Sequence, residues 1–131
     1  MAIAAVAAVA VGSQLTPPVA RAELHNITYV ARVEGVAPGS QATFVTNDNQ
    51  ISTAPLSTVP GNAFQANTVL ADPHLAGMQV TVRWPYSANV HCEIDVDDNV
   101  AVQVDQVVHP APSSTDPMNG VLPCGAPLPN R

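Results

Sequence analysis

The sequence contains no lysine and only four arginines, which face ten aspartate and glutamate residues and leave a formal net charge of −6. A protein that binds nucleic acid neutralises several phosphates with lysine and arginine side chains, so this chain is a poor candidate for that role. Charged residues make up 11 % of the chain and hydrophobic residues 47 %. Intrinsically disordered chains show the opposite balance. The composition therefore predicts one small, acidic, folded domain.

Catalytic and cofactor-binding motifs are also missing. The sequence has no Gly-x-Ser-x-Gly nucleophile elbow, no glycine-rich phosphate loop and no Cys-x-x-Cys motif. No two of its four histidines stand at metal-ligand spacing: His25, His74, His91 and His109. We therefore predict a protein without catalytic residues, metal or cofactor. A serine, a histidine and a carboxylate can still meet in space without a local motif, and such a convergence would indicate an enzyme.

No hydrophobic run reaches the length of about 20 residues that a membrane-spanning helix needs. The longest run, residues 2–11, consists of alanine, isoleucine and valine, and small residues follow at Ala20 and Ala22. This pattern is typical of a secretory signal peptide, although no basic residue precedes the run. We predict a signal-peptide helix in residues 1–22, cleavage before Glu23 and a mature chain without a stable membrane span. A buried N-terminal helix and a single membrane span are the alternatives.

Cys92 and Cys124 are the two cysteines of the chain. In an oxidising compartment an even number of cysteines favours a disulfide. On the chain-entropy model, a loop of this length contributes about 3.5–4 kcal/mol to the free energy of unfolding. We predict that this disulfide ties back a C-terminal tail, residues 110–131. Six of the 22 residues of the tail are proline, so no regular element is expected to run far in it.

Between the N-terminal segment and the tail, apolar and polar residues alternate with a period of two, which is typical of half-buried β-strands. The strands that we predict are residues 27–33, 41–46, a stretch resuming near Gln50, 64–70, 78–84, 92–96 and 100–104. Asp97, Asp98 and Asn99 predict a tight hairpin between the last two strands, with Val100, Val102 and Val104 facing inward. Residues 72–77 predict a single helical turn capped by Asp72.

Six or seven strands at spacings near ten residues, with one cross-link, indicate an all-β fold. We predict a small antiparallel β-sandwich of immunoglobulin-like kind, closed by one disulfide and preceded by a signal-peptide helix. The sandwich domain is assigned to residues 23–109. A small β-barrel is the alternative architecture.

Trp84 and Tyr86 are the candidate partner-contact residues. Pro85 ends the predicted strand and presents Tyr86 on a loop, where tyrosine is a favoured contact residue. The simpler interpretation of Trp84 is the core tryptophan of a sandwich, packed near the disulfide. Because the chain is acidic, a basic or neutral partner fits it better than an anionic surface.

A weak cation site is a further candidate. Asp95, Asp97 and Asn99 match the first three ligand positions of a calcium-binding loop. However, Val100 stands where that loop requires glycine, and Gln106 stands where it requires a bidentate glutamate. The simpler interpretation is a solvated strand face followed by a turn.

Residues 92–97 have the sequence Cys-Glu-Ile-Asp-Val-Asp, and Val100 follows on the return strand. The chain also has a later partner cysteine and an opening Ile-Thr-Tyr at residues 27–29. Together these features resemble the periplasmic domain of the mycobacterial small membrane proteins called MmpS. The absence of lysine and the abundance of alanine and valine suit a high-GC actinobacterial genome. The resemblance implies a disulfide-closed sandwich outside the cytoplasmic membrane. In MmpS proteins that domain assists a large lipid or siderophore exporter. The short apolar run at residues 2–11 and the proline-rich tail depart from that family.

Two functions follow as hypotheses for a secreted, periplasmic or cell-envelope protein. The first is a non-catalytic interaction or accessory protein, linked to an envelope transport system and contacting a protein partner. The alternative is a small carrier that holds an apolar small molecule between its sheets. An apolar cavity of several hundred Å³ would favour the carrier. A closed core with an exposed sheet edge or aromatic patch would favour the interaction protein.

Overall fold

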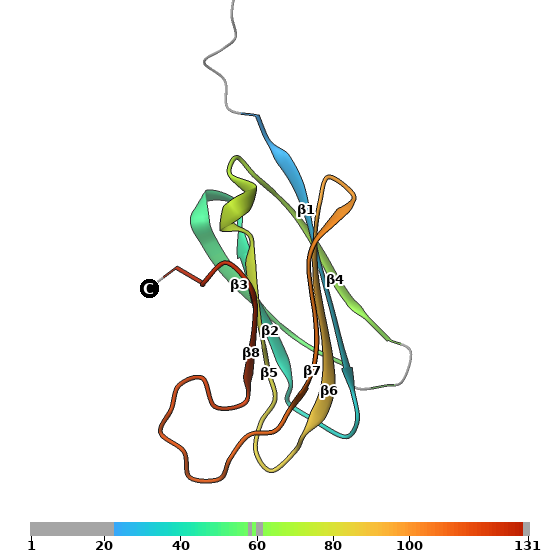
Figure 1. Ribbon diagram of the computed structural model, residues 1–131, viewed down its shortest axis with the longest axis vertical. Coiled ribbons are helices and arrows are strands. Elements are labelled where there is room, and N and C mark those ends of the chain that lie inside the picture. The colour runs from blue at the N-terminus through green and yellow to red at the C-terminus, as the bar shows by residue number, and fades with distance from the viewer. Residues whose placement is uncertain (1–22, 58, 60–61, 130–131) are drawn as a thin grey trace, which may run out of the picture.

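Eight strands form two antiparallel four-stranded sheets that pack face to face in the computed structural model (Figure 1). The first sheet has the order β4 (Phe64–Leu70), β1 (His25–Glu34), β6 (Ala88–Val96), β7 (Asn99–Val108). The second has the order β3 (Gln50–Pro55), β2 (Gln41–Thr46), β5 (Gly77–Thr81), β8 (Val121–Gly125). The structure describes residues 23–57, 59 and 62–129, so the predicted signal-peptide helix in residues 1–22 lies outside the described residues. The predicted β-sandwich is confirmed, and the barrel alternative is wrong.

The chain passes repeatedly from one sheet to the other, and only β2–β3 and β6–β7 are consecutive strands that pair within one sheet. β1 lies beside β4 in one sheet, while β2 lies beside β5 in the other. This crossing is a Greek-key arrangement of the kind found in immunoglobulin-like sandwiches. The disulfide is placed differently, because it joins β6 to β8 rather than the two strands that it joins in antibody domains.

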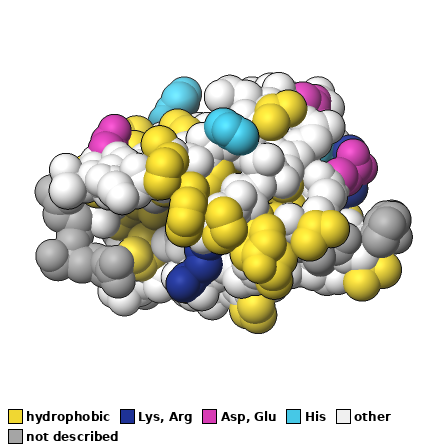
Figure 2. All heavy atoms as spheres, turned by 90° about the horizontal axis from the view of Figure 1, so that it is seen from below, with side chains coloured by type: hydrophobic (Ala, Val, Ile, Leu, Met, Phe, Trp, Pro, Cys, Tyr) yellow, Lys and Arg dark blue, Asp and Glu magenta, His cyan; other side chains and the backbone are white. Residues whose placement is uncertain are grey.

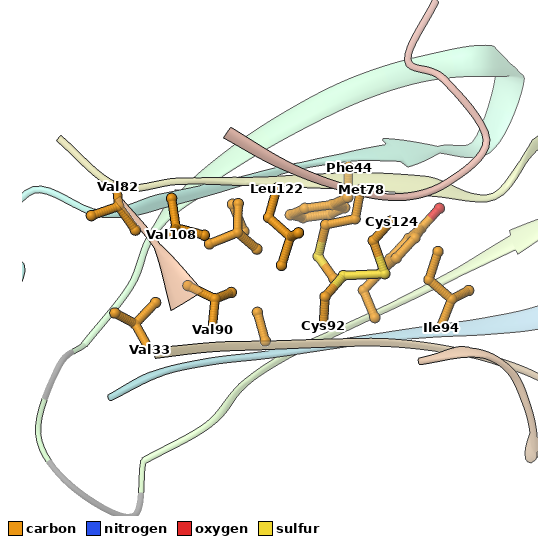
Figure 3. Close-up of a cluster of buried hydrophobic side chains, with 14 of the residues drawn as sticks. Val33, Phe44, Met78, Val82, Val90, Cys92, Ile94, Val108, Leu122 and Cys124 are labelled. Carbon is orange, nitrogen blue, oxygen red and sulfur yellow. A yellow bond between two sulfur atoms is a disulfide. The ribbon is translucent and has the colours of Figure 1, made fainter. Parts of the chain in front are cut away.

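The core lies between the sheets and is filled by side chains from both (Figure 3). Every second residue of β1 is buried, as its alternation predicts. One of these residues, Tyr29, donates its hydroxyl proton to the Val45 carbonyl at 2.6 Å, and its ring centroid lies 5.2 Å from that of Phe44. Burial raises the pKa of Tyr29 to about 12, because the phenolate would lose its hydration.

The predicted disulfide between Cys92 and Cys124 is confirmed. Both cysteines are almost completely buried, and Cys124 pairs with Met78 across β5 and β8. The bridge therefore crosses the core from one sheet to the other beside Met78 and Phe44 (Figure 3). It links the sheets covalently at a position where apolar packing already holds them together.

The proline-rich segment contains a strand that the sequence analysis did not predict. β8 lies within residues 110–131 and pairs with β5, so the sandwich extends past residue 109. Pro123 is compatible with this strand because β8 is an edge strand, and an edge residue can lack an outward amide proton without breaking a ladder hydrogen bond. Close packing continues just beyond β8, where a Cβ atom at Gly77 would overlap the Ala126 carbonyl.

The β6–β7 hairpin contains a bulge that decides which of its side chains are buried. Its tight turn places Asp97 and Asp98 at positive φ, as the turn residues predict. The register shifts by one residue between Ile94 and Asp95, and Ala101 is left without a partner. Beyond the shift, Val102 pairs with Ile94 and Val104 with Cys92, so both valines face inward as predicted. Val100 precedes the shift and is 57 % exposed, so its predicted inward orientation is wrong.

Two 3-10 turns complete the described elements: η3 (Asn47–Asn49) and η4 (Pro73–Leu75). The second is the predicted helical turn, and the Asp72 side chain caps it by accepting a hydrogen bond from the His74 amide. Among the described residues, no helix has the length and apolar character needed to cross a membrane.

Candidate interaction surface

Trp84 and Tyr86 lie on a tight turn at one end of the sandwich. β5 ends at Thr81, and the Val82 amide then donates a hydrogen bond to the Gly120 carbonyl at 2.8 Å. The Tyr86 amide donates to the Arg83 carbonyl at 2.9 Å, which closes a turn with Trp84 and Pro85 at its two corners. Trp84 is consequently 56 % exposed, and the core-tryptophan interpretation is wrong.

The β1–β2 loop, residues 35–40, packs against this turn. A Cβ atom at Gly39 would lie 3.1 Å from the Arg83 Cδ atom, and one at Gly35 would contact Ala88. Val36, at the tip of the same loop, is 77 % exposed. Figure 2 looks onto this end of the molecule and shows hydrophobic side chains gathered in a band across it. We call Val36, Trp84, Pro85 and Tyr86 the loop-end surface.

Two of the three candidate cation ligands, Asp97 and Asn99, are held in contacts within the protein. The Asp97 carboxylate accepts one hydrogen bond from the Asn26 amide at 2.9 Å, and its other oxygen lies 2.7 Å from Nδ1 of His25. The Asn99 amide donates to the Asp97 carbonyl at 3.2 Å. Asp95 lies on the outer face of β6, opposite Val100. Among the described residues, no group of three or more histidine, cysteine or acidic side chains has the geometry of a metal site.

The Asp97 contacts join the β6–β7 turn to the start of β1. The Asp97 amide also donates to the Asn26 carbonyl at 2.8 Å. The hydrogen bond to Asp97 is the main cause of a raised pKa at His25, and the same contact lowers the pKa of Asp97. This ion pair therefore links the start of β1 to the β6–β7 turn.

A second cluster of charged side chains lies on the outer face of the first sheet. Nδ1 of His91 lies 2.7 Å from Asp105 across β6 and β7, and its Nε2 lies 3.2 Å from Glu93. Further along β6, one carboxylate oxygen of Asp95 is buried without a hydrogen-bond partner. Burial, together with the neighbouring Glu93, raises the pKa of Asp95. We call His91, Glu93, Asp95 and Asp105 the acidic row.

The acidic row was not predicted from the sequence. The alternation of β6 implies that His91 and Glu93 share the outer face, since both flank Cys92. Without the bulge, however, His91 would be paired with Val104 instead of Asp105. No residue near the turn signals that shift strongly enough to predict the cross-strand pair.

The described part of the chain has open hollows at its surface. One of about 440 Å³ lies at the end opposite the loop-end surface, where β4 ends and η4 follows. Its apolar lining includes Leu24, Val69 and Leu75, which are all exposed. Between the sheets, the residues of the core cluster are at most 8 % exposed.

The described serines and histidines do not combine into a nucleophile and base. Ser40 is buried, and its hydroxyl donates to the Ala37 carbonyl at 2.7 Å. Among the described residues, the side-chain partners of His25, His74 and His91 are carboxylates.

Comparisons with protein-family models, with curated proteins and with solved structures found no match to this chain.

Proposed function

We propose that the protein is an exported, non-catalytic interaction protein of the cell envelope. The observation that carries the proposal is the loop-end surface, which exposes Trp84 and Tyr86 at the end of a sandwich with a filled core. Tryptophan and tyrosine are enriched among the residues that dominate binding energy at protein interfaces. An exposed apolar patch on a small domain is a common mark of such an interface.

The rigid surroundings of the loop-end surface support this role. The turn that carries Trp84 is anchored by the Val82–Gly120 and Tyr86–Arg83 backbone hydrogen bonds. A contact residue that is already held in place loses little conformational entropy when it binds. The backbone that carries Trp84 and Tyr86 is therefore held in place before a partner binds.

Export is supported by the disulfide, because structural disulfides persist in oxidising compartments. The apolar run in residues 2–11 and the small residues at Ala20 and Ala22 supply the matching signal-peptide pattern. The resemblance of residues 92–97 to MmpS proteins adds the partner that we propose, a transport protein of the envelope.

Photo-crosslinking tests the interaction role. A photoreactive phenylalanine analogue is placed at Tyr86, and intact producing cells are irradiated. We expect one discrete adduct with an envelope transport protein, identified by mass spectrometry, and we expect Trp84→Ala to reduce its yield several-fold. Trp84 is exposed, so this substitution should leave the fold intact.

The matched control places the same analogue at Gln65, an exposed residue of β4. Equal adducts from positions 65 and 86, or no adduct from position 86 in protein whose disulfide is intact, would contradict the proposal.

A carrier role is the second candidate, with the apolar ligand in the surface hollow of about 440 Å³ instead of between the sheets, where side chains fill the core. The volume of the hollow falls within the range of small-molecule sites, and Asn47, Asn49 and Asp72 add polar groups to its lining. Titration with a medium-chain fatty acid, followed by methyl NMR, tests this role. A carrier would show saturable shifts at Leu24, Val69 and Leu75 that Val69→Asp abolishes. Shifts spread over the whole surface, or none, would exclude it.

A further inference from the structure

The four sheet edges of the sandwich differ in how well they are protected against pairing with another chain. β3 ends at Pro55, and β8 carries Pro123 in its middle. Proline protects an edge strand against pairing with another chain, because it cannot donate a ladder hydrogen bond. β7 is the longest edge, with ten residues, and contains no proline. β4 also lacks proline but has seven residues.

β7 is also unusually open. Seven of its ten residues are exposed, and its inward-facing Val102 and Val104 are half-buried instead of fully buried. Half of the strand is valine, which has a high β-propensity. A long, valine-rich edge without proline is the kind that natural proteins ordinarily protect, since it is a template for strand addition.

The charges around β7 indicate which kind of strand would pair with it. Asp105 on β7 and Glu93 on the neighbouring β6 face outward, and Asp98 lies in the turn that leads into β7. In the part of the chain that the structure describes, the ion pairs of these and other carboxylates all involve histidine. Of the two described arginines, Arg32 lies on β1 opposite His91 without forming an ion pair with the acidic row, and Arg83 lies outside the strands.

We propose that β7 binds an extended, basic segment of a partner protein as an added strand. In such a strand, alternate side chains face opposite sides of the sheet. Lysine or arginine on the outer side would face Asp105 and the potential of the acidic row, while small aliphatic residues on the inner side would cover Val102 and Val104. Backbone hydrogen bonds supply affinity, and the alternation of basic and aliphatic residues supplies specificity.

A second copy of the chain is a poorer occupant of this edge. Two β7 strands would bring two acidic rows into one continuous sheet, and like charges at that spacing repel each other. An extended basic segment instead gains from the same charges.

This inference rests on the interaction role proposed above but concerns a different surface. The loop-end surface is formed by residues outside β7. Loss of the adduct at Tyr86 and loss of binding at β7 can therefore be observed separately.

The test uses the oxidised, isotope-labelled chain and a capped synthetic peptide, Thr-Lys-Val-Lys-Val-Lys-Thr, observed by NMR. We expect slower hydrogen exchange at alternate amides of β7, together with intermolecular α-proton contacts between the peptide and β7. Asp105→Asn should weaken binding about two- to five-fold, as expected for loss of one exposed charge pair. Asp116→Asn removes an equal charge from the β7–β8 loop and should leave the affinity unchanged.

Two further controls separate strand addition from simple charge attraction. A peptide with the same charges but N-methylated at alternate residues should not bind, because it cannot form the ladder. The Trp84→Ala variant should bind the unmodified peptide as the parent chain does. Binding of the N-methylated peptide with equal affinity, protection of β4 instead of β7, or no change in β7 exchange would each overturn the proposal.

Discussion

Trp84 continues the apolar alternation of Met78, Val80 and Val82, yet its side chain lies in solvent. Alternation of apolar and polar residues predicts which face a side chain occupies only while the chain continues as a β-strand. Here the Val82 amide pairs with Gly120, which is distant in sequence, and the chain turns at once. The sequence contained one local sign of this outcome, Pro85, which favours the end of a strand. The sequence therefore allowed an exposed Trp84 to be proposed, but deciding between exposure and burial required the contact between Val82 and Gly120.

The His25–Asp97 ion pair predicts a pH-dependent contribution to stability. The pKa of His25 is raised above its value of 6.5 in the unfolded chain, so the ion pair stabilises the fold fully below pH 6.5. This contribution is lost as the pH rises through the pKa of His25 in the folded state. The lowered pKa of Asp97 stabilises the fold above 3.8, and this contribution is lost as the pH falls through the folded pKa. We expect His25→Gln to lower the urea midpoint of unfolding most between pH 3.8 and pH 6.5. The decrease should be small because His25 is only partly buried and Asp97 is exposed to solvent, which screens the pair.

Urea unfolding of the parent chain and of His25→Gln from pH 3 to pH 9 provides the measurement. A difference in midpoint that stays constant from pH 5 to pH 9 would show that His25 acts through packing and not through its charge.

For Asp95 we predict the opposite effect on stability, because its ionised form is unfavourable in the folded state. Burial and Glu93 raise its pKa, so the destabilisation is present above the folded pKa and absent below the unfolded value of 3.8. Asp95→Asn should therefore raise the melting temperature at pH 7, since its amide can donate to Glu93 and removes a like charge. Thermal melts at pH 7 and at pH 3 check this. A lower melting temperature at pH 7 would contradict the account.

At the scale of elements, the strands were predictable where one face is buried and the other solvated. Residues 27–33 and 64–70 show that alternation, and both are strands of the sandwich. β8 was not predictable, because its three-residue core of leucine, proline and cysteine is too short for a period and contains a residue that normally interrupts strands. Its position is determined by pairing with β5 and by the disulfide, both of which are contacts distant in sequence.

The bulge in the β6–β7 hairpin shows a different limit. An unbroken two-residue hairpin from Asp97 and Asp98 would pair Cys92 with Gln103, which would turn the valines of β7 outward. Burying valines from both strands therefore requires one extra residue, which is Ala101. The inward face could be predicted from hydrophobicity, whereas the position of the bulge, and with it the pairing of His91 with Asp105, could not.

Removal of the disulfide tests how β8 is held. The bridge closes a sequence separation of 32 residues, for which the chain-entropy model gives about 3.5–4 kcal/mol. We expect the double variant Cys92→Ala, Cys124→Ala to lose roughly that free energy of unfolding in urea. Hydrogen exchange should show β8 opening before β1. A loss below about 1 kcal/mol would mean that packing alone holds β8.

At the scale of the whole molecule, the composition has separate causes in separate segments. The valines lie mainly in the strands, and the prolines gather near the C-terminus, where one of them lies within β8. Basic residues are scarce, and the described ion pairs of Glu93 and Asp105 are both with His91. Strand order cannot be read from alternation, so the exposure of β7 as an edge was not predictable from the sequence.

The proposal that the protein is exported rests on the disulfide between Cys92 and Cys124 and on the signal-peptide pattern in residues 1–22. Intact-mass spectrometry of the secreted protein, alkylated without prior reduction, tests this most directly. We expect a chain that begins at Glu23 and carries no alkyl group, because Cys92 and Cys124 are bonded to each other. A protein that stays in the cytoplasm, or a secreted chain that retains residues 1–22 or carries two alkylated cysteines, would contradict it.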